Sequence, residues 1–327
     1  MKRGMRSLGK WIAILLAVLL VLPVFSGCAA EEKVIGIAWR EDTDSEFYTN
    51  IVEAVKQVGG KPVLLGQVVA EYLTYDEEGH LVGCSDDVGA MTAEAADLIK
   101  ENLWENTNVK EVMAGIDAVI FTGGEDISST LFCEPEPWHG IEAEIDYNVT
   151  RDASDYILMA YCIENDIATL GFCRGMQMLA VVSGAAMIQD IPTYFEELGK
   201  DYGYEHRNEK ETPSSYRDYA PHGVELAEGS WVGGIFGAGT LEGCPSWHHQ
   251  AVLSVENTNL TVTGSTETCG ESMIEIIEYQ GKSFIIGFQF HPEAATVKHV
   301  THAQNAESFM NMETSLLVFR ALLDKVK

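Results

Sequence analysis

Short apolar runs alternate with stretches of helical periodicity along residues 33–183. Runs typical of buried strands occupy residues 33–38, 62–65, 116–121 and 167–171. Apolar residues recur at helical spacing over residues 47–58, 151–164 and 174–183. Strands that alternate with helices pack into a mostly parallel sheet that is covered by helices on both faces. The pattern therefore predicts an α/β fold.

The pattern changes after Pro221, where strands follow one another without intervening helices. We expect successive antiparallel strands at residues 224–226, 261–263, 273–279 and 283–290. A last amphipathic helix is indicated by Phe309, Met312, Leu316, Phe319 and Leu323. Two polar stretches, residues 71–87 and 200–219, lack periodicity and are expected to form long loops. Because no linker divides the chain, residues 28–327 are predicted to form one domain.

Residues 1–27 are typical of a secretory signal. Four basic residues precede an apolar run over residues 11–24. This run is shorter than the ~20 residues of a membrane span. Ser26 and Gly27 then precede Cys28, and small residues before a cysteine resemble the signal of bacterial lipoproteins. We expect Cys28 to be acylated and to become the mature N-terminus; an uncleaved anchor helix is the alternative. Both interpretations predict an extracytoplasmic, membrane-anchored protein of a bacterium, and the first predicts a lipoprotein.

The charge balance restricts the partners of this chain. Its 50 acidic residues face 21 basic ones, which gives a formal net charge of −29. Nucleic-acid binding needs a basic face that neutralises phosphates, so nucleic acid is excluded as a partner. The same excess disfavours a surface that binds anionic lipids, so we expect membrane contact through the N-terminal lipid only. The six cysteines after Cys28 show none of the close pairs of a zinc site or of a disulfide framework.

The segment GFCRG, residues 171–175, connects a predicted strand directly to a predicted helix. Glycine stands two residues before and two residues after Cys173, which is the spacing of a nucleophile elbow. The helix N-terminus beneath such a turn favours a thiolate, because its unpaired N–H groups and its dipole stabilise negative charge. The pattern indicates a cysteine nucleophile, with the backbone N–H of Arg174 directed at the reacting carbonyl oxygen. A buried structural cysteine is the alternative.

The segment FQFHPE closes another predicted strand with His291 and Glu293. Residues two apart on a strand point to the same side, so Glu293 can orient the ring of His291. Cysteine, histidine and glutamate together supply the nucleophile, the base and the orienting group of an activated thiol. Separately, Gly123 and Gly124 follow a strand, and a glycine pair there can offer a backbone N–H to an oxyanion. Taken singly, these features also fit a surface histidine and an ordinary turn.

Five motifs together resemble the class I glutamine amidotransferase-like family, and within it the gamma-glutamyl hydrolase branch, which includes gamma-glutamyl-gamma-aminobutyrate hydrolases. In chain order they are TGGEDISSTLF, the helix start RDASD, LGFCRGMQMLAVVSGAAMIQDI, SWHHQAV and GFQFHPE. The resemblance covers residues 34–327. It implies a flavodoxin-like three-layer α/β/α fold with a mostly parallel central sheet and a nucleophile elbow. It also implies that no metal or organic cofactor is required.

The resemblance assigns a role to each matching residue. It implies that Cys173 is the nucleophile, His291 the base and Glu293 the third member of the triad. It implies an oxyanion hole formed by Gly124 and the N–H of Arg174. The substrate-binding positions that it implies are Gly123, Gln177, Ser246, His248 and Gln250.

Three features of the sequence qualify this assignment. Glu125 stands where the family has glycine, and a carboxylate at the oxyanion loop predicts repulsion of anionic leaving groups. The stretch from residue 72 to residue 108 is longer than the family usually shows. His248 and His249 are adjacent, and adjacent residues of a strand face opposite ways, so we do not expect them to share a metal ion.

The sequence as a whole predicts a hydrolase of gamma-glutamyl amide bonds that acts through a cysteine thioester. Its expected partner is a gamma-glutamyl small molecule or peptide outside the cytoplasm. Two alternatives use the same scaffold. One is a non-catalytic lipoprotein that binds a gamma-glutamyl compound or an amino acid, and the other is the glutaminase subunit of an amidotransferase.

Overall fold

The computed structural model describes residues 32–208, 219–237, 239–296 and 308–326. The expectations for residues 1–31, including acylation of Cys28, lie outside the described residues. The chain divides into the units Met1–Glu32 and Lys33–Lys327, and every element given below belongs to the second unit. None of the helices in the described ranges has the length and apolar character that a membrane span requires.

Nine strands of the described residues form one sheet in the order β2-β1-β3-β4-β11-β10-β9-β6-β7. The first five run parallel to one another. They are β2 (Lys61–Leu64), β1 (Val34–Ile37), β3 (Ala118–Phe121), β4 (Ala168–Phe172) and β11 (Ile285–Phe288). Counted along the chain, their order is 2-1-3-4-5, which is that of flavodoxin-like folds. The α/β fold expected from the sequence is therefore confirmed.

The other four strands extend the sheet in antiparallel fashion. They are β10 (Glu271–Tyr279), β9 (Leu260–Thr268), β6 (Ala220–Leu226) and β7 (Gly239–Ser246). A two-stranded sheet pairs β5 (Ala186–Ile188) with β8 (Ala251–Ser254). The expected antiparallel series is confirmed, and its last strand has a second role: β11 is antiparallel to β10 but parallel to β4, with Phe288 opposite Phe172. A strand between two sheet halves must satisfy both, and alternation of apolar residues does not reveal this double role.

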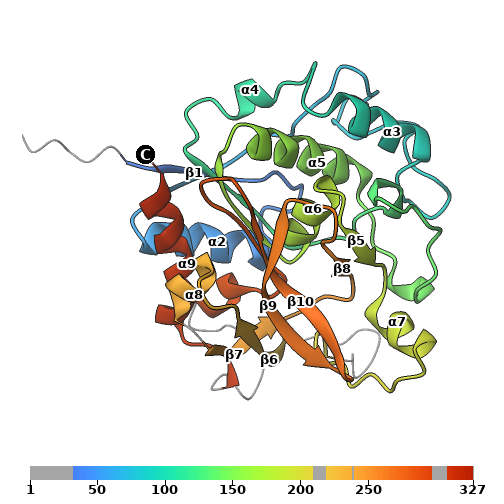
Figure 1. Cartoon of the computed structure of the whole chain (residues 1–327). Helices are drawn as coiled ribbons and strands as arrows, with labels where there is room; N and C mark the ends of the chain where they lie inside the picture. The colour runs from blue at the N-terminus through green and yellow to red at the C-terminus, as the bar shows by residue number, and fades with distance from the viewer. Residues whose placement is uncertain (1–31, 209–218, 238, 297–307, 327) are drawn as a thin grey trace, which may run out of the picture. The chain divides into compact units, whose positions relative to one another are not determined.

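Helices cover both faces of the sheet (Figure 1). Along β3 the buried side chains alternate: Val119 and Phe121 join one core, and Ile120 joins the other. The first core contains side chains of α3 (Ala93–Asn102), α5 (Val149–Glu164) and α6 (Arg174–Val182). The second contains side chains of α2 (Glu46–Gln57), α8 (Trp231–Phe236) and α9 (Met312–Lys325). This is the three-layer α/β/α arrangement.

Segments outside this frame differ in part from expectation. Residues 71–87 form a loop, as predicted, built on two similar turns in which Asp76 and Asp86 each accept hydrogen bonds from backbone N–H groups two and four residues on. The stretch from residue 72 to residue 108, noted above for its length, also contains α3. The short helix α4 (Val109–Val112) comes directly after it. Another short helix, α7 (Ile191–Glu197), precedes residues 200–208. Phe309 lies before α9 rather than within it, because Asn311 caps that helix by accepting from the N–H of Thr314.

Candidate active site

The turn between β4 and α6 places Cys173 at the carboxyl end of the parallel strands. Cys173 adopts φ 49°, a left-handed conformation that is rare outside glycine and typical of a nucleophile elbow. A Cβ on Gly171 would lie 2.5 Å from the backbone of Gly175, and one on Gly175 would lie 2.7 Å from Phe121. Both glycines are therefore required by close packing. The N–H of Cys173 donates to the carbonyl of Phe288 at 2.7 Å, which fixes the turn to β11.

β11 brings His291 and Glu293 to the same edge of the sheet. His291 Nδ1 lies 2.7 Å from Glu293 Oε1, and both side chains are buried. Glu293 belongs to the short 3₁₀ helix Pro292–Thr296, so the two side chains meet through a bend rather than along a strand. The N–H of His291 donates to the carbonyl of Pro245 at 2.7 Å. The carboxylate fixes the ring and leaves Nε2 as the nitrogen available for proton transfer.

The pKa of His291 reflects this environment. Burial alone lowers the pKa of an imidazole, but the charges of Glu293 and Cys173 outweigh burial and raise the pKa of His291 to about 10. A raised pKa keeps the imidazole protonated at neutral pH, so His291 can supply the proton that a leaving amine needs.

The loop after β3 faces the same point. Gly124 has φ 142°, and a Cβ there would overlap the guanidinium of Arg151. A Cβ on Gly123 would lie 2.7 Å from Cε1 of His291. Arg174 is the first residue of α6, so its N–H belongs to the unpaired first turn of the helix. The two groups expected to form an oxyanion hole, Gly124 and the N–H of Arg174, thus stand at the ends of adjacent parallel strands.

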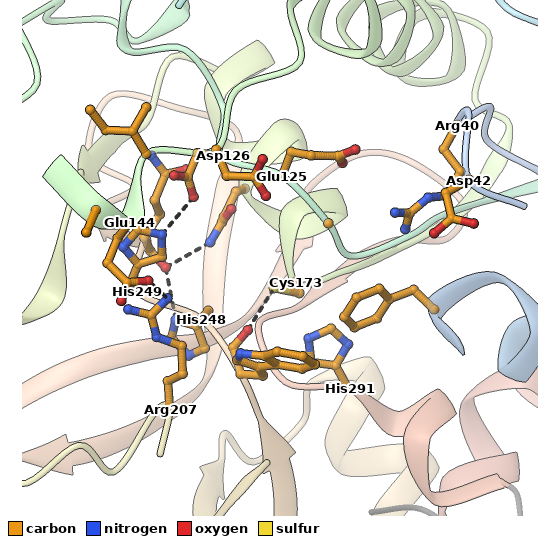
Figure 2. A pocket seen from close by; sticks show the side chains of 18 residues that line it. Arg40, Asp42, Glu125, Asp126, Glu144, Cys173, Arg207, His248, His249 and His291 are labelled. Carbon is orange, nitrogen blue, oxygen red and sulfur yellow. Dashed lines mark hydrogen bonds and ion pairs between the residues drawn. The ribbon is translucent and has the colours of Figure 1, made fainter. Parts of the chain in front are cut away.

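A pocket of about 620 Å³ opens over these groups (Figure 2). Five of the predicted site residues line it together with Gly124, namely Cys173, Gln177, His248, Gln250 and His291. Gly123 and Ser246 do not line the pocket; Ser246 is fully buried, and its hydroxyl has no hydrogen-bond partner among the described residues. Cys173, His291 and three of the five expected substrate-binding positions therefore line one cavity, while Glu293 does not line it and contacts His291.

The glutamines of the pocket are held by the chain itself. Gln177 Nε2 donates to the carbonyl of Gln250 at 2.8 Å and to Gln289 Oε1 at 3.3 Å. The side chain of Gln250 accepts from the N–H of Ile127 at 3.0 Å. These bonds connect α6, the loop 246–250 and the loop after β3. They fix the walls of the pocket, so the rotamers of both glutamines are set before any ligand arrives.

The comparison with known families agrees with this geometry. The model of the family described as peptidase C26 matches residues 89–293. The chain belongs to the peptidase C26 family. Membership indicates a cysteine hydrolase of the glutamine amidotransferase-like type.

Individual relatives of this peptidase C26 chain are distant. Gamma-glutamyl-gamma-aminobutyrate hydrolase of Escherichia coli O157:H7 is 27% identical over 193 residues, which cover 58% of this chain and 69% of that protein. Protein NtpR of Enterococcus hirae is 28% identical over 192 residues, which cover 58% of this chain and 70% of that protein. The solved structure of PurLQS from Thermotoga maritima aligns with a TM-score of 0.49 at 11% identity, over 90% of this chain and 99% of that one.

Several charged residues of the peptidase C26 pocket were not predicted as site residues from the sequence, among them Arg40 and Arg207, and His249 was considered only as a neighbour of His248. His249 lies between two carboxylates, with Nε2 2.8 Å from Asp126 and Nδ1 3.0 Å from Asp190. Burial lowers the pKa of His249, but the two carboxylates outweigh burial and raise it above its ordinary value. Only the doubled histidine of SWHHQ signalled this position. His248 faces other partners: its Nε2 lies 4.0 Å from Glu275 Oε1, whereas His249 contacts Asp126 and Asp190.

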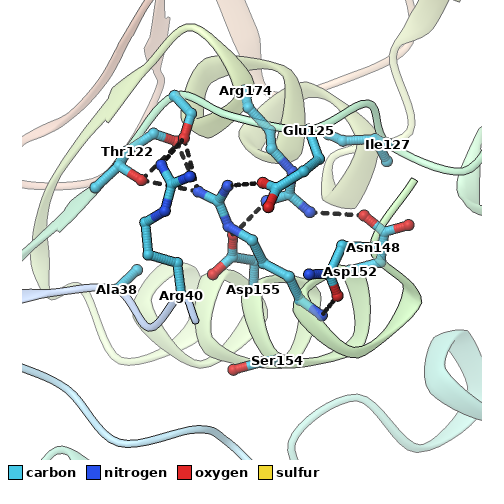
Figure 3. Close-up of polar contacts among 12 residues, drawn as sticks. Ala38, Arg40, Thr122, Glu125, Ile127, Asn148, Asp152, Ser154, Asp155 and Arg174 are labelled. Carbon is cyan, nitrogen blue, oxygen red and sulfur yellow. Dashed lines mark hydrogen bonds and ion pairs between the residues drawn. The ribbon is translucent and has the colours of Figure 1, made fainter. Parts of the chain in front are cut away.

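Next to the pocket, two buried arginines form ion pairs with two buried aspartates and with Glu125, which is partly exposed (Figure 3). Arg174 pairs with Asp152 at 2.6 Å and with Asp155. Arg151 pairs with Glu125 and lies 3.4 Å from Asp155. The side chain of Arg174 therefore points into the core, and only its backbone N–H faces the reacting centre. The RDASD motif supplies three members of this network, namely Arg151, Asp152 and Asp155 of α5.

The structure corrects the interpretation of Glu125. Burial raises the pKa of a carboxyl group, but Arg151 and Arg174 outweigh burial and hold the pKa of Glu125 at about 2. The carboxylate is thus ionised and paired with Arg151. The repulsion of anionic leaving groups expected from Glu125 alone is largely cancelled by its partner, because an ion pair presents little net charge at a distance.

The network predicts a large loss of stability for Arg174→Met. The substitution leaves the buried carboxylate of Asp152 without its cation and removes one of the two guanidiniums beside Asp155. Breaking a buried pair costs about 3–5 kcal/mol. Urea unfolding measures this loss. Arg320→Met is the matched control, because Arg320 pairs with Glu313 at 3.0 Å on the surface, where such a pair contributes at most about 1 kcal/mol. Equal losses in the two variants would contradict a structural role for the buried network.

Proposed function

We propose that this member of the peptidase C26 family hydrolyses gamma-glutamyl amide bonds through a thioester at Cys173. The observation that carries the proposal is the convergence of Cys173, the His291–Glu293 pair and the Gly124 loop on one pocket. The distant relationship to a gamma-glutamyl-gamma-aminobutyrate hydrolase supports the same substrate class.

The reaction follows from the roles of these groups. The thiolate of Cys173 attacks the gamma-carbonyl carbon, and the oxyanion forms beside Gly124 and the N–H of Arg174. Collapse of the tetrahedral intermediate breaks the C–N bond, and His291 gives its proton to the departing amine. His291 then accepts a proton from water, which attacks the thioester and releases glutamate. Glu293 keeps the imidazole oriented throughout.

The charges of the pocket suit an amino-acid group. Carboxylates and guanidiniums both line it: Arg207 pairs with Glu144 at 3.1 Å, and Arg40 lies on the opposite side of the pocket (Figure 2). The glutamyl end of the substrate carries an ammonium and a carboxylate, so a pocket with both signs of charge can hold it by charge-assisted hydrogen bonds. Hydrolysis of a panel of gamma-glutamyl amides by the purified protein tests the proposal. Tight binding without turnover would favour a binding protein, and glutaminase activity only with a second protein would favour an amidotransferase subunit.

We predict a preference among leaving groups that depends on charge. Acidic residues outnumber arginines in the pocket lining, and the whole chain is acidic. We expect kcat/KM for gamma-glutamyl-lysine to exceed that for gamma-glutamyl-glutamate by roughly tenfold at low salt, with gamma-glutamyl-glutamine between them. High salt should reduce the difference, because it screens charges that are exposed to solvent. A higher value for the glutamate compound at low salt would refute this prediction.

We also propose that the enzyme acts outside the cytoplasm as a lipoprotein. The support is the signal pattern of residues 1–27 and the small residues before Cys28. We expect intact mass spectrometry of the membrane fraction to find an N-terminal acylated Cys28. Cys28→Ala should leave the precursor uncleaved or release the protein from the membrane. An unmodified Cys28 in the membrane-bound protein would contradict the proposal.

A further inference from the structure

Four side chains next to the catalytic pocket converge on one buried point. His206 lies in the segment after α7, His222 on β6, His248 in the loop after β7, and Glu275 on β10. The rings of His222 and His248 lie 5.1 and 5.0 Å from the ring of His206, measured between centroids. The reaction described above uses neither Glu275 nor the first two histidines.

The ligand atoms of this cluster lie at separations that suit a shared ion. Glu275 Oε1 is 3.1 Å from His206 Nδ1 and 4.0 Å from His248 Nε2, and Glu275 Oε2 is 3.7 Å from His222 Nε2. Ligands bound to zinc at about 2.0–2.2 Å in a tetrahedron stand roughly 3.4 Å apart. The ligand atoms of His206, His222 and Glu275 lie within 4.8 Å of one another, so small side-chain movements bring these three to bonding distance of one ion. His248 stands beside them and needs a larger movement to become the fourth ligand.

Each of these atoms is buried and lacks a hydrogen-bond partner among the described residues. This holds for His206 Nδ1, His222 Nε2, His248 Nε2 and both carboxylate oxygens of Glu275. His206 and Glu275 are fully buried, and His248 is 4% exposed. Burial of a polar group without a partner costs free energy, and burial of a charged group costs more. Five such atoms at one point indicate that something else satisfies them.

The hydrogen bond made by the other nitrogen of each ring shows where the hydrogen of that histidine lies. His222 Nδ1 lies 3.2 Å from the carbonyl of Gly223, and His248 Nδ1 lies 2.9 Å from the carbonyl of Gln250. A carbonyl only accepts, so both Nδ1 atoms carry the hydrogen and both Nε2 atoms direct lone pairs at Glu275. His206 Nε2 is likewise held, at 2.8 Å from Thr268 Oγ1. Lone pairs that face a carboxylate repel it unless a cation lies between them.

We propose that His206, His222, His248 and Glu275 bind a divalent transition-metal ion, with zinc the best match. Three imidazoles and one carboxylate are a zinc donor set, and outer hydrogen bonds to carbonyls are the usual support of metal-bound histidines. Four protein ligands fill a tetrahedral shell, so the ion has a structural role. The ligands are spread over residues 206–275 in no compact motif, which is why sequence inspection did not find them.

The site fixes one wall of the catalytic pocket. His248 follows Trp247, whose carbonyl lies 3.8 Å from Sγ of Cys173. The N–H of His248 also donates to the carbonyl of His206 at 3.1 Å, so two ligands belong to segments that are already paired. An ion at this point joins β6, β10 and two loops beside the nucleophile. It takes no part in bond breaking.

A cobalt titration of the purified full chain tests the proposal. After chelator treatment and dialysis, Co²⁺ is added to the wild type, and its d–d absorption reports tetrahedral ligation directly. We expect one equivalent of Co²⁺ to give an intense visible spectrum and one equivalent of Zn²⁺ to displace it. Glu275→Gln and His222→Gln should each weaken binding by about 100-fold or more, since each removes a direct ligand. Circular dichroism identifies any variant that has not folded.

The chain offers a matched control. Asp76, Glu78 and His80 form a second group with metal-ligand spacing, but all three are exposed. His80→Gln should therefore leave the stoichiometry and the spectrum unchanged. Folded wild type without saturable Co²⁺ binding would overturn the proposal. So would unchanged binding in both cluster variants, or loss of the spectrum in His80→Gln. None of these readouts depends on gamma-glutamyl hydrolysis, so failure here leaves the proposed reaction untouched.

Discussion

Replacement of Cys173 by alanine is expected to abolish hydrolysis of every gamma-glutamyl amide that the wild type cleaves. Among the described residues that line the pocket, Cys173 is the only cysteine, and a thioester can form only on a cysteine thiol. The melting temperature should stay close to that of the wild type. The hydrogen bond of the thiol to the carbonyl of Trp247 is long, at 3.8 Å, and alanine occupies the same backbone conformation at little extra cost.

Cys133 provides the control for this experiment. It is an exposed cysteine, and its thiol is hydrogen-bonded to the carbonyl of Ala185 at 3.4 Å. Cys133→Ala should keep full activity. The comparison separates the effect of removing any thiol from the effect of removing the nucleophile. Turnover and melting temperature are measured on both variants from the same purification. Full activity in Cys173→Ala would end the proposed mechanism.

The second large effect on the reaction rate is expected when the general base, His291, is replaced. His291→Asn should slow acylation by about 10²–10⁴-fold, which is the usual contribution of general acid–base catalysis. Glu293→Gln should slow it by a smaller factor, because an amide can still accept from Nδ1 and hold the ring. Single-turnover kinetics with a chromogenic gamma-glutamyl anilide measure acylation directly. Equal rates for His291→Asn and the wild type would show that another group serves Cys173.

The pH profile of Glu293→Gln distinguishes an electrostatic role from a purely positional one. Glu293 and Cys173 together raise the pKa of His291 to about 10 against the effect of burial. Removing the negative charge of Glu293 should lower that pKa, so the imidazolium is lost at a lower pH. We expect the alkaline limb of the acylation profile to move toward neutral pH in this variant. An unmoved limb would mean that Glu293 does no more than hold the ring.

The sequence predicted the parts of the fold and site that depend on local pattern. Alternating apolar runs predicted the parallel strands, and glycine spacing predicted the turn that carries Cys173. These features can be recognised in the sequence because each depends on a few neighbouring residues. At Gly171 and Gly175, for example, a side chain would collide with the backbone of the turn or with Phe121, so only glycine fits. The pairing of His291 with Glu293 was also predicted, although the chain bends at Pro292 to achieve it.

The remainder depends on contacts between distant segments. Glu125 was interpreted from its position in a loop, and only the fold shows that Arg151 of α5 neutralises it. Arg40 and Arg207 line the pocket from segments that are far apart in the sequence, and neither belongs to a recognisable motif. The parallel pairing of β11 with β4 likewise reflects sheet order rather than composition. Partners separated by many residues leave no periodic signal in a single sequence.

The central claim is that gamma-glutamyl amides are cleaved through a covalent thioester on Cys173. Its most direct test is acid quenching within the first turnover of a gamma-glutamyl anilide, followed by intact and peptide mass spectrometry. We predict a burst of aniline that is stoichiometric with enzyme, and an added glutamyl group on the peptide that contains Cys173. Turnover with no burst and no adduct on that peptide, under conditions in which hydrolysis is observed, would contradict it.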